Sequence, residues 1–280
     1  ISPAPGMRGS RGFCMCGHGK DSIDYWAIAT LGNAADFGNA VAHTDGKSGV
    51  TNITRGVMAS GNTGNSIEYI TCATIGNATD FGDDTIGTGR KPITVGNGTR
   101  GIFCGRGDVA SNVIDYVTIA SVGNATDFGD LTVARGDSGR GEDNTRAVMM
   151  GGGTNNTIDY ITMATTGNAT DFGDRTVAYE YGGGTGGAGR AMAIGGNATY
   201  NTMDYVVIQT PGNATDFGDL TVGARGLDAC SNDTRGVRAG GYANQVTLDY
   251  WAMTTPGNAV DFGDLNDGKQ YCGSMSGVPL

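Results

Sequence analysis

A segment with a central tyrosine occurs six times along this 280-residue chain at nearly constant spacing. The tyrosines are separated by 44, 47, 44, 45 and 45 residues, and each is followed twelve positions later by the phenylalanine of an Asp-Phe-Gly. The pairs are Tyr25 and Phe37, Tyr69 and Phe81, Tyr116 and Phe128, Tyr160 and Phe172, Tyr205 and Phe217, and Tyr250 and Phe262. A third marker, an arginine heading a short apolar run, occurs at Arg11, Arg55, Arg100, Arg146, Arg190 and Arg235. Such a period is typical of a repeat architecture.

Residues 100–144 show what one repeat contains. Residues 100–107 form a short apolar run that ends in glycine, and residues 113–120 alternate between apolar and polar side chains, as half-buried strands do. Residues 123–130, Gly-Asn-Ala-Thr-Asp-Phe-Gly-Asp, are rich in turn formers, and a further short strand is expected at residues 131–134. The sequence therefore predicts three or four short antiparallel strands in each repeat and no helix.

An all-β unit of about 45 residues that is repeated six times predicts a six-bladed β-propeller. The blades are expected over residues 11–280 and start near residues 11, 55, 100, 146, 190 and 235. A β-solenoid is the alternative, but solenoid coils usually repeat every ~18 to 30 residues, which is shorter than the repeat of about 45 residues found here. Residues 1–10 are left over. Either they supply the outer strand of the last blade and close the ring, or residues 270–275 do so and the N-terminal segment extends elsewhere.

Composition and charge exclude several classes of protein. The chain has 51 glycines but no Gly-X-Y period and only six prolines, which excludes collagen and proline-rich disorder. Its net charge is −10 and its 18 basic residues are scattered, so we expect no binding to nucleic acid. No apolar run approaches the roughly 18 residues of a membrane-spanning helix, so no membrane insertion is expected. The six cysteines share no spacing that predicts a disulfide framework.

Two recurring motifs invite a metal-binding interpretation. Asp-Phe-Gly is also the magnesium-binding motif of protein kinases, but here it occurs six times without a nucleotide loop or a catalytic His-Arg-Asp. Asn124, Asp127 and Asp130 carry the oxygen ligands that calcium prefers, without the spacing of an EF-hand loop. We expect both motifs to be structural, with the Asn and Asp side chains bonded to turn backbone.

One cluster is confined to the first repeat. Cys14, Cys16 and His18 alternate along a predicted strand and carry ligands that suit a soft metal. The one other histidine is His43, and no second cysteine pair has ligand spacing, so packing is the expected role. We therefore predict no catalytic residue, no cofactor-binding residue, no metal site and no cofactor.

The order of strand, double glycine, hairpin and aromatic residue resembles the kelch class of propeller repeats. The paired Tyr and Trp spacing of kelch is replaced here by Tyr25 to Phe37 and its five equivalents. The consensus Ile-Asp-Tyr followed by Gly-Asn-Ala-Thr-Asp-Phe-Gly-Asp-Leu-Thr-Val is similar to repetitive tail-fibre-type structural proteins of marine cyanobacterial phages, over residues 11–264. The first copy departs from it at Ala35 and Asn39, and the last at Val260. The resemblance implies a virion appendage, and thus a location more than a mechanism.

On this basis we expect a non-enzymatic structural protein of a virion, used in a tail fibre, spike or decoration. The expected partners are other virion proteins or copies of itself in a homo-oligomer, and host surface glycans. Residues 45–54, 88–99, 136–145 and 180–189 differ most between repeats and suit recognition or assembly. One alternative is an extracellular microbial protein that assembles into a filament or surface layer. The other is a propeller enzyme acting on polysaccharide, which predicts a carboxylate or histidine cluster on one face of the ring.

Overall fold

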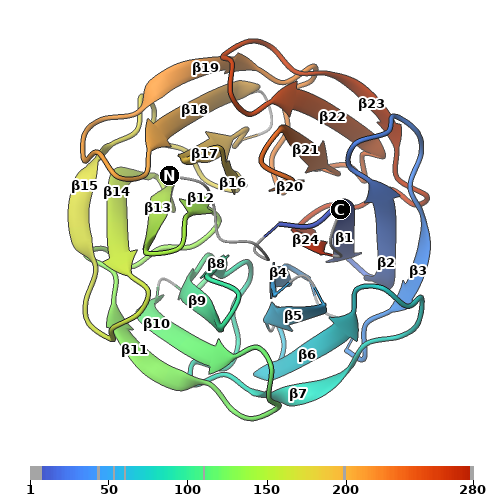
Figure 1. Ribbon diagram of the computed structural model, residues 1–280, viewed down its shortest axis with the longest axis horizontal. Helices are drawn as coiled ribbons and strands as arrows, with labels where there is room; N and C mark the ends of the chain where they lie inside the picture. Colours follow the sequence, from blue (N-terminus) through green and yellow to red (C-terminus); the bar gives the residue numbers. More distant parts are fainter. Residues whose placement is uncertain are drawn as a thin grey trace.

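The computed structural model describes residues 8–42, 45–52, 54–59, 61–109, 111–197 and 200–277. Within these ranges the chain forms 24 β-strands and no helix. Figure 1 shows the strands as sheets arranged radially around a central axis, which is the arrangement of a β-propeller. The prediction of an all-β, propeller-like fold is confirmed. No helix long and apolar enough to span a membrane occurs in the described part of the chain.

Each sequence repeat contributes strands at four distances from the axis. The innermost strands are β4 (Ser48–Thr51), β8 (Ile93–Gly96), β12 (Gly139–Glu142), β16 (Gly186–Gly187), β20 (Asp228–Ser231) and β24 (Gly273–Gly277). Next come the strands headed by the marker arginines: β1 (Arg11–Gly17), β5 (Arg55–Ala59), β9 (Arg100–Arg106), β13 (Arg146–Gly152), β17 (Arg190–Ile194) and β21 (Arg235–Ala239). The tyrosine strands are β2 (Lys20–Ala27), β6 (Ser66–Thr71), β10 (Ser111–Thr118), β14 (Asn155–Thr162), β18 (Thr202–Val207) and β22 (Thr247–Ala252). The outermost strands carry Asp-Phe-Gly: β3 (Ala35–Asn39), β7 (Thr79–Asp83), β11 (Thr126–Asp130), β15 (Thr170–Asp174), β19 (Thr215–Asp219) and β23 (Val260–Asp264).

The strands pair in antiparallel order from the axis outward. Four sheets have four strands each, in the orders β24-β1-β2-β3, β4-β5-β6-β7, β8-β9-β10-β11 and β20-β21-β22-β23. The fifth sheet has eight strands, because β12 pairs with β17 at the single position Arg140–Met192 and β16 also pairs with β17. Two units of four strands are therefore joined at their inner edges.

The two ends of the described chain meet in one sheet. The last strand, β24, pairs with β1, with Arg11 opposite Gly277 and Phe13 opposite Met275. β24 overlaps residues 270–275, one of the two segments considered for ring closure. It lies innermost beside the first repeat, whereas the sequence suggested an outer strand of the last blade. Arg8, Gly9 and Ser10 belong to no strand, and residues 1–7 lie outside the described ranges.

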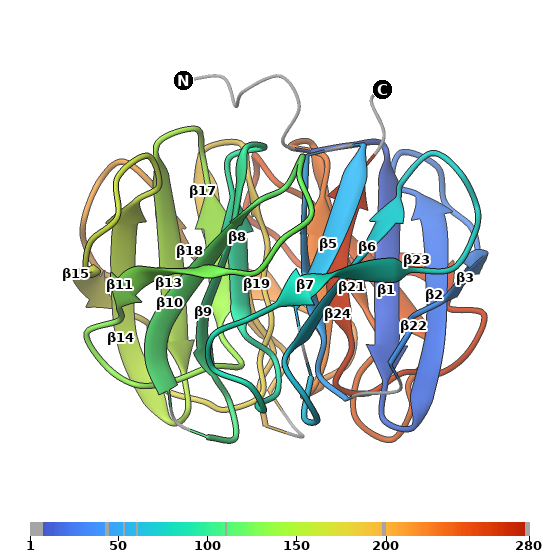
Figure 2. The same cartoon turned by 90° about the horizontal axis from the view of Figure 1, so that it is seen from below.

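The two faces of the ring can be defined by this closing pair. β1 begins and β24 ends on one face, which we call the terminal face, and it is uppermost in Figure 2. β1 ends and β24 begins on the opposite face, which we call the loop face. The segments that lead into the innermost strands lie on the loop face.

The marker arginines and aromatics form one recurring stack between neighbouring sheets. Arg100 lies over the ring of Tyr116 at 4.7 Å, and Tyr116 meets the edge of Phe128 at 6.0 Å. The Arg100 guanidinium also donates to the carbonyl oxygen of Met163 in the next repeat, at 2.9 Å. All six repeats contain this arrangement, with arginine-to-ring distances of 4.2 to 4.7 Å. The strict spacing of the three markers thus serves the joints between sheets.

The Gly-Asn-Ala-Thr-Asp-Phe-Gly-Asp consensus also joins neighbouring sheets. Asn124 accepts a hydrogen bond from the backbone N–H of Asp83 in the preceding repeat, at 3.1 Å, and the N–H of Gly123 donates to Phe81 at 2.8 Å. Corresponding asparagine bonds recur at Asn33, Asn77, Asn168, Asn213 and Asn258. The prediction that these asparagine side chains bond to the backbone of their own turn is therefore wrong. They accept hydrogen bonds from the backbone of the neighbouring sheet instead. They occupy backbone groups that an outermost strand would otherwise leave unpaired.

The innermost strands are the main feature that the sequence did not reveal. Residues 45–54, 88–99 and 136–145, expected to be variable recognition segments, contain β4, β8 and β12. The strand expected at residues 131–134 is wrong, because the third and fourth strands of that repeat are β11 and β12 on either side of it. Within residues 180–189, the strand β16 has only two residues. These strands are rich in glycine, serine and threonine and lie closest to the narrow axis of the ring.

Candidate functional site

The loop face carries a ring of residues in the left-handed backbone conformation. One such residue precedes each innermost strand: Gly46, Lys91, Asp137, Tyr181, Gly226 and Tyr271, with φ between 43° and 74°. Among the described residues, five hydrogen bonds join members of this ring to one another. They run from the N–H of Gly46 to Tyr271, of Lys91 to Gly46, of Asp137 to Lys91, of Gly226 to Tyr181, and of Tyr271 to Gly226. This backbone ring surrounds the mouth of the central channel.

The side chains of this ring differ between repeats. Two positions are glycine, for which this conformation carries no penalty, but Lys91, Asp137, Tyr181 and Tyr271 are held there at a cost of about 1–3 kcal/mol each. Strain of this kind is concentrated at functional sites in proteins. The repeats therefore differ in side-chain chemistry at a position where their backbones share one conformation.

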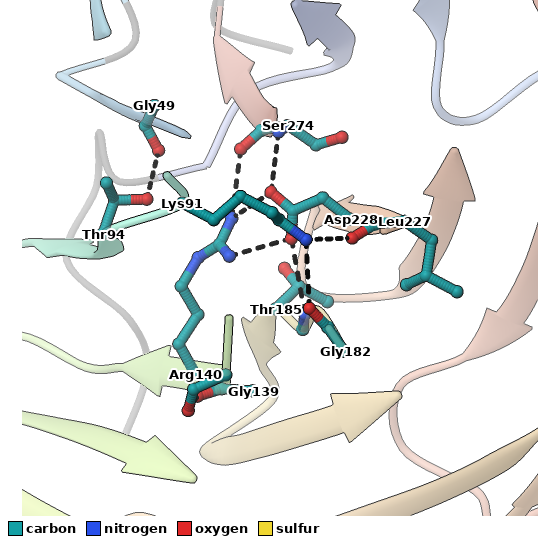
Figure 3. Close-up of polar contacts among 12 residues, drawn as sticks. Gly49, Lys91, Thr94, Gly139, Arg140, Gly182, Thr185, Leu227, Asp228 and Ser274 are labelled. Atoms are coloured by element: carbon teal, nitrogen blue, oxygen red, sulfur yellow. Dashed lines mark hydrogen bonds and ion pairs between the residues drawn. The ribbon is translucent and has the colours of Figure 1, made fainter. Parts of the chain in front are cut away.

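Lys91 reaches from the mouth across the channel (Figure 3). Its ammonium group donates to the carbonyl oxygens of Gly182 at 3.0 Å and Leu227 at 2.7 Å. Those carbonyls precede β16 and β20, whereas Lys91 precedes β8. The lysine thus ties three inner segments together and fills the channel with a nearly fully buried cation.

Arg140 and Asp228 form a second link across the axis (Figure 3). The guanidinium donates two hydrogen bonds of 2.8 Å to the two carboxylate oxygens. Asp228 also accepts from the backbone N–H of Ser274 at 2.7 Å, and Arg140 donates to the Ser274 carbonyl at 3.2 Å. Burial lowers the pKa of Arg140, but the Asp228 carboxylate outweighs burial and the net shift is upward. The Arg140 guanidinium therefore remains charged, and its bonds with Asp228 and Ser274 join β12, β20 and β24.

The channel is closed again near the terminal face. The Arg8 guanidinium bonds to the Glu142 carboxylate at 3.1 Å and to Asp233 at 2.9 Å. Between Arg8 and Arg140 lies a cavity of about 50 Å³ lined largely by serine, threonine and glycine. The Ser274 hydroxyl lines it and is buried without a hydrogen-bond partner. A space of this size suits a few water molecules and is too small for an organic ligand.

The carboxylates of the Ile-Asp-Tyr segments are buried and have basic neighbours. A bulge between the isoleucine and the aspartate positions turns both residues inward in every repeat. The pairs are Asp24 with Lys269, Glu68 with Lys47, Asp159 with Arg135, Asp204 with Arg175, and Asp249 with Arg238. Near Asp115 the cation is Arg106, which pairs with Asp84 at 2.7 Å. The basic residues look scattered in the sequence because most repeats supply their cation from different positions; only Arg135 and Lys269, each seven residues after the Phe of Asp-Phe-Gly, are equivalent.

Cys14, Cys16 and His18 do not come together as a site. Both cysteines are fully buried, and burial raises the pKa of the Cys16 thiol to about 12. His18 instead lies exposed on the loop face, where its Nδ1 is 2.6 Å from a carboxylate oxygen of Asp45. In the described ranges no group of three His, Cys, Asp or Glu side chains could hold a metal ion. His43, the other histidine, lies outside these ranges.

Sequence reasoning missed Lys91, Asp137, Arg140 and Asp228. A signal was nevertheless present in the repeat alignment. Arg140 pairs with the residue three positions after the marker arginine of its sheet. The residues that pair with the same position in four other repeats are all small: Gly49, Thr94, Ala229 and Ser274. A single arginine among small residues marks a break in the repeat.

Comparison with known proteins supports the fold alone. No family model matches the chain, and no curated protein matches its sequence. Among solved structures, the structure of YjhT is similar with a TM-score of 0.69 and 11% sequence identity. The similarity covers 84% of this chain and 88% of that one. An identity this low carries the propeller-like architecture and no function.

Proposed function

We propose that this chain is a six-bladed, kelch-like propeller that serves as a non-enzymatic module of a phage particle. In this role it belongs to a tail fibre, spike or decoration, mounted toward the particle by its terminal face. Its loop face is presented outward for recognition of the host surface, including its glycans. The partners are other virion proteins or further copies of the chain.

The difference between the two faces is the observation that carries this proposal. Arg100, Tyr116, Asn124 and their equivalents are engaged in joints between sheets, so the residues that repeat are structural. The residues that occur once at their repeat position, such as Lys91 and Asp137, gather around the mouth on the loop face. Variable side chains on a rigid ring are the usual design of a recognition surface.

Exposed aliphatic side chains support assembly through the other side. Leu31, Ile75 and Val122 occupy equivalent positions before the Gly-Asn of three neighbouring repeats, and each is more than half exposed. They follow the ends of β2, β6 and β10, near the terminal face. Each gives its sheet an exposed apolar contact point near the terminal face, which a partner protein would cover.

Cryo-electron microscopy of the native particle or secreted material tests the proposal. Density for the ring on a tail or capsid, with the loop face outward, is the expected result. A continuous stack of rings outside any particle would instead support the extracellular filament. Particles carrying Tyr181→Ala or Glu180→Ala should bind host cells less well, whereas Asp127→Asn on the outer rim should not change binding.

An enzyme acting on polysaccharide is the second candidate. It is favoured by the pair of His18 and Asp45, which occurs once in the ring, and by the buried carboxyl of Asp137 at the mouth. Burial raises the pKa of Asp137 to about 7, where a carboxyl can serve as an acid or a base. Release of reducing ends from host polysaccharide, lost in both His18→Ala and Asp137→Asn, would establish this function in place of simple recognition.

A further inference from the structure

Arg225 is a cation of the loop face that has no acidic partner among the described residues. It lies in the connection from β19 to β20, and its guanidinium forms no hydrogen bond or ion pair with any described residue. Lys20 and Arg90 on the same face do have such partners, Asp267 and Asp45. The Arg225 Nε atom is buried without a partner, whereas the two Nη atoms are not buried. The N–H groups of this outer edge are therefore free for a ligand.

Two tyrosine rings hold the Arg225 guanidinium in place. It lies 4.0 Å from the centre of the Tyr242 ring and 5.7 Å from that of Tyr181. Glu180, the acidic neighbour of Tyr181, is hydrogen-bonded to the Tyr181 hydroxyl instead of to Arg225. Contact with aromatic faces orients a guanidinium but leaves its charge and its N–H donors unused. The cation is thus positioned before any partner arrives.

The backbone places Arg225 between two hairpins of the loop face. The N–H of Ala224 donates to the carbonyl oxygen of Tyr200, in the β17–β18 connection, at 3.2 Å. The N–H of Tyr242, in the β21–β22 connection, donates to the carbonyl oxygen of Arg225 at 2.7 Å. Tyr200 and Tyr242 therefore flank the segment that carries the free guanidinium.

Both flanking tyrosines are exposed and supported from behind. Tyr200 is 41% exposed and stacks on the buried Tyr179 ring, with the ring centres 4.7 Å apart. Tyr242 is 42% exposed although the guanidinium covers one of its faces. Val222, in the same connection as Arg225, is 48% exposed. Because stacking already restricts the rings, a partner that covers them loses less conformational entropy on binding.

We infer that the surface formed by Tyr200, Val222, Arg225 and Tyr242 binds an acidic segment of a partner protein. A glutamate or aspartate carboxylate of the partner accepts hydrogen bonds from the Arg225 Nη atoms, and apolar neighbours of that residue cover the tyrosines and Val222. Tyrosine and arginine dominate the binding energy of protein–protein interfaces. An acidic sugar carries the same carboxylate, but Val222 offers no partner to its hydroxyl groups. The inference rests on the proposed use of the loop face for recognition and names the chemistry of the partner.

NMR titration of the full ¹⁵N-labelled chain, followed at the backbone amide of Val222, tests the inference. The probes are the peptide acetyl-Gly-Leu-Glu-Leu-Gly-amide, the same peptide with glutamine in place of glutamate, and sodium glucuronate. The glutamate peptide should give a saturable shift, and the glutamine peptide should bind about 10-fold more weakly, as expected for loss of a hydrogen bond to a charged group. Equal binding of the two peptides, tighter binding of glucuronate, or no shift with any probe would overturn the inference.

Two variants separate Arg225 from the general charge of the face. Arg225→Gln should weaken binding of the glutamate peptide about 10-fold and leave binding of the glutamine peptide unchanged. Lys20→Gln removes the same charge from a loop-face cation that Asp267 already pairs, so it should bind as wild type. Unfolding midpoints of both variants check that the ring is intact. Wild-type affinity in Arg225→Gln would also overturn the inference, even where microscopy places the ring on a particle with its loop face outward.

Discussion

Arg140 of β12 and Asp228 of β20 face each other across the central axis and share two hydrogen bonds of 2.8 Å. The two residues come from repeats that are not neighbours in the ring, and the Asp228 side chain is fully buried. The channel is therefore closed by a charge pair that no consensus position of the repeat supplies.

Breaking this pair should destabilise the protein more than replacing it. Asp228→Asn or Arg140→Met leaves one buried charge without its partner, which typically costs about 3–5 kcal/mol. The double variant Arg140→Met, Asp228→Leu removes both charges and should recover much of that loss. Unfolding midpoints in urea would measure both effects. Equal losses in the single and double variants would show that the two charges do not stabilise each other.

Alanine at Gly82 should cost more than alanine at Gly123. Both glycines have nearly the same φ, +148° and +154°, so the conformational cost of alanine is matched. A Cβ at Gly82 would lie 2.5 Å from the carbonyl oxygen of Gly123 in the next repeat, whereas a Cβ at Gly123 meets nothing within 4 Å. We expect Gly82→Ala to lose about 1–3 kcal/mol more than Gly123→Ala, the usual cost of overpacking. Thermal unfolding of the two variants is the measurement, and equal losses would count against a tight joint.

The repeat period and the strand patterns were enough to predict the propeller-like fold. The marker spacing is strict because Arg100, Tyr116 and Phe128 stack on one another, and a shift of one residue would break the stack. The same joints explain why Asp-Phe-Gly and Gly-Asn recur without being a metal site.

Most of the innermost strands were not predicted because they lack the alternation that identifies a strand; β8, Ile-Thr-Val-Gly, alternates but has only four residues. β12 reads Gly-Arg-Gly-Glu, and it forms a strand because β13 pairs along its whole length. The ring around the mouth was equally hidden. Gly46 and Gly226 are the residue type that its backbone favours, but Lys91, Asp137 and Tyr181 adopt the same conformation against their own preference.

Asp137 should make the protein less stable as the pH rises from about 4 to about 7. Burial raises the pKa of this carboxyl from 3.8 to about 7. Between these values the folded protein keeps a proton that the unfolded chain has lost, so the free energy of unfolding falls with rising pH and levels off above 7. The slope is at most about 1.4 kcal/mol per pH unit. Asp137→Asn should lack this part of the slope in urea titrations at a series of pH values. Parallel curves for the variant and wild type would refute the assignment.

All six cysteines should resist alkylation while the protein is folded. Each thiol is free and buried, and burial raises the pKa of Cys72 to about 11 and of Cys104 to about 12. The thiolate is the reactive form, and the hydrogen bond with Cys14 lowers the pKa of Cys272, but that thiol is fully buried like the others, so iodoacetamide at pH 8 should modify none of them. Mass spectrometry should then show six additions after unfolding in guanidinium. Rapid labelling of any cysteine in the native protein would contradict the buried positions.

Met275 should control how firmly the ring is closed. It lies on β24 opposite Phe13 of β1, is 4% exposed, and approaches Gly49 and Gly56 of the neighbouring sheet. Met275→Ala should cost about 2–5 kcal/mol, as buried methionines do, and should speed amide hydrogen exchange in β1 and β24 before the rest of the chain. Met192→Ala removes a similarly buried methionine on β17, away from the closing pair. In that variant amide hydrogen exchange should rise around β17 and not first in β1 and β24. If the two variants exchange alike in β1 and β24, closure does not depend on this side chain.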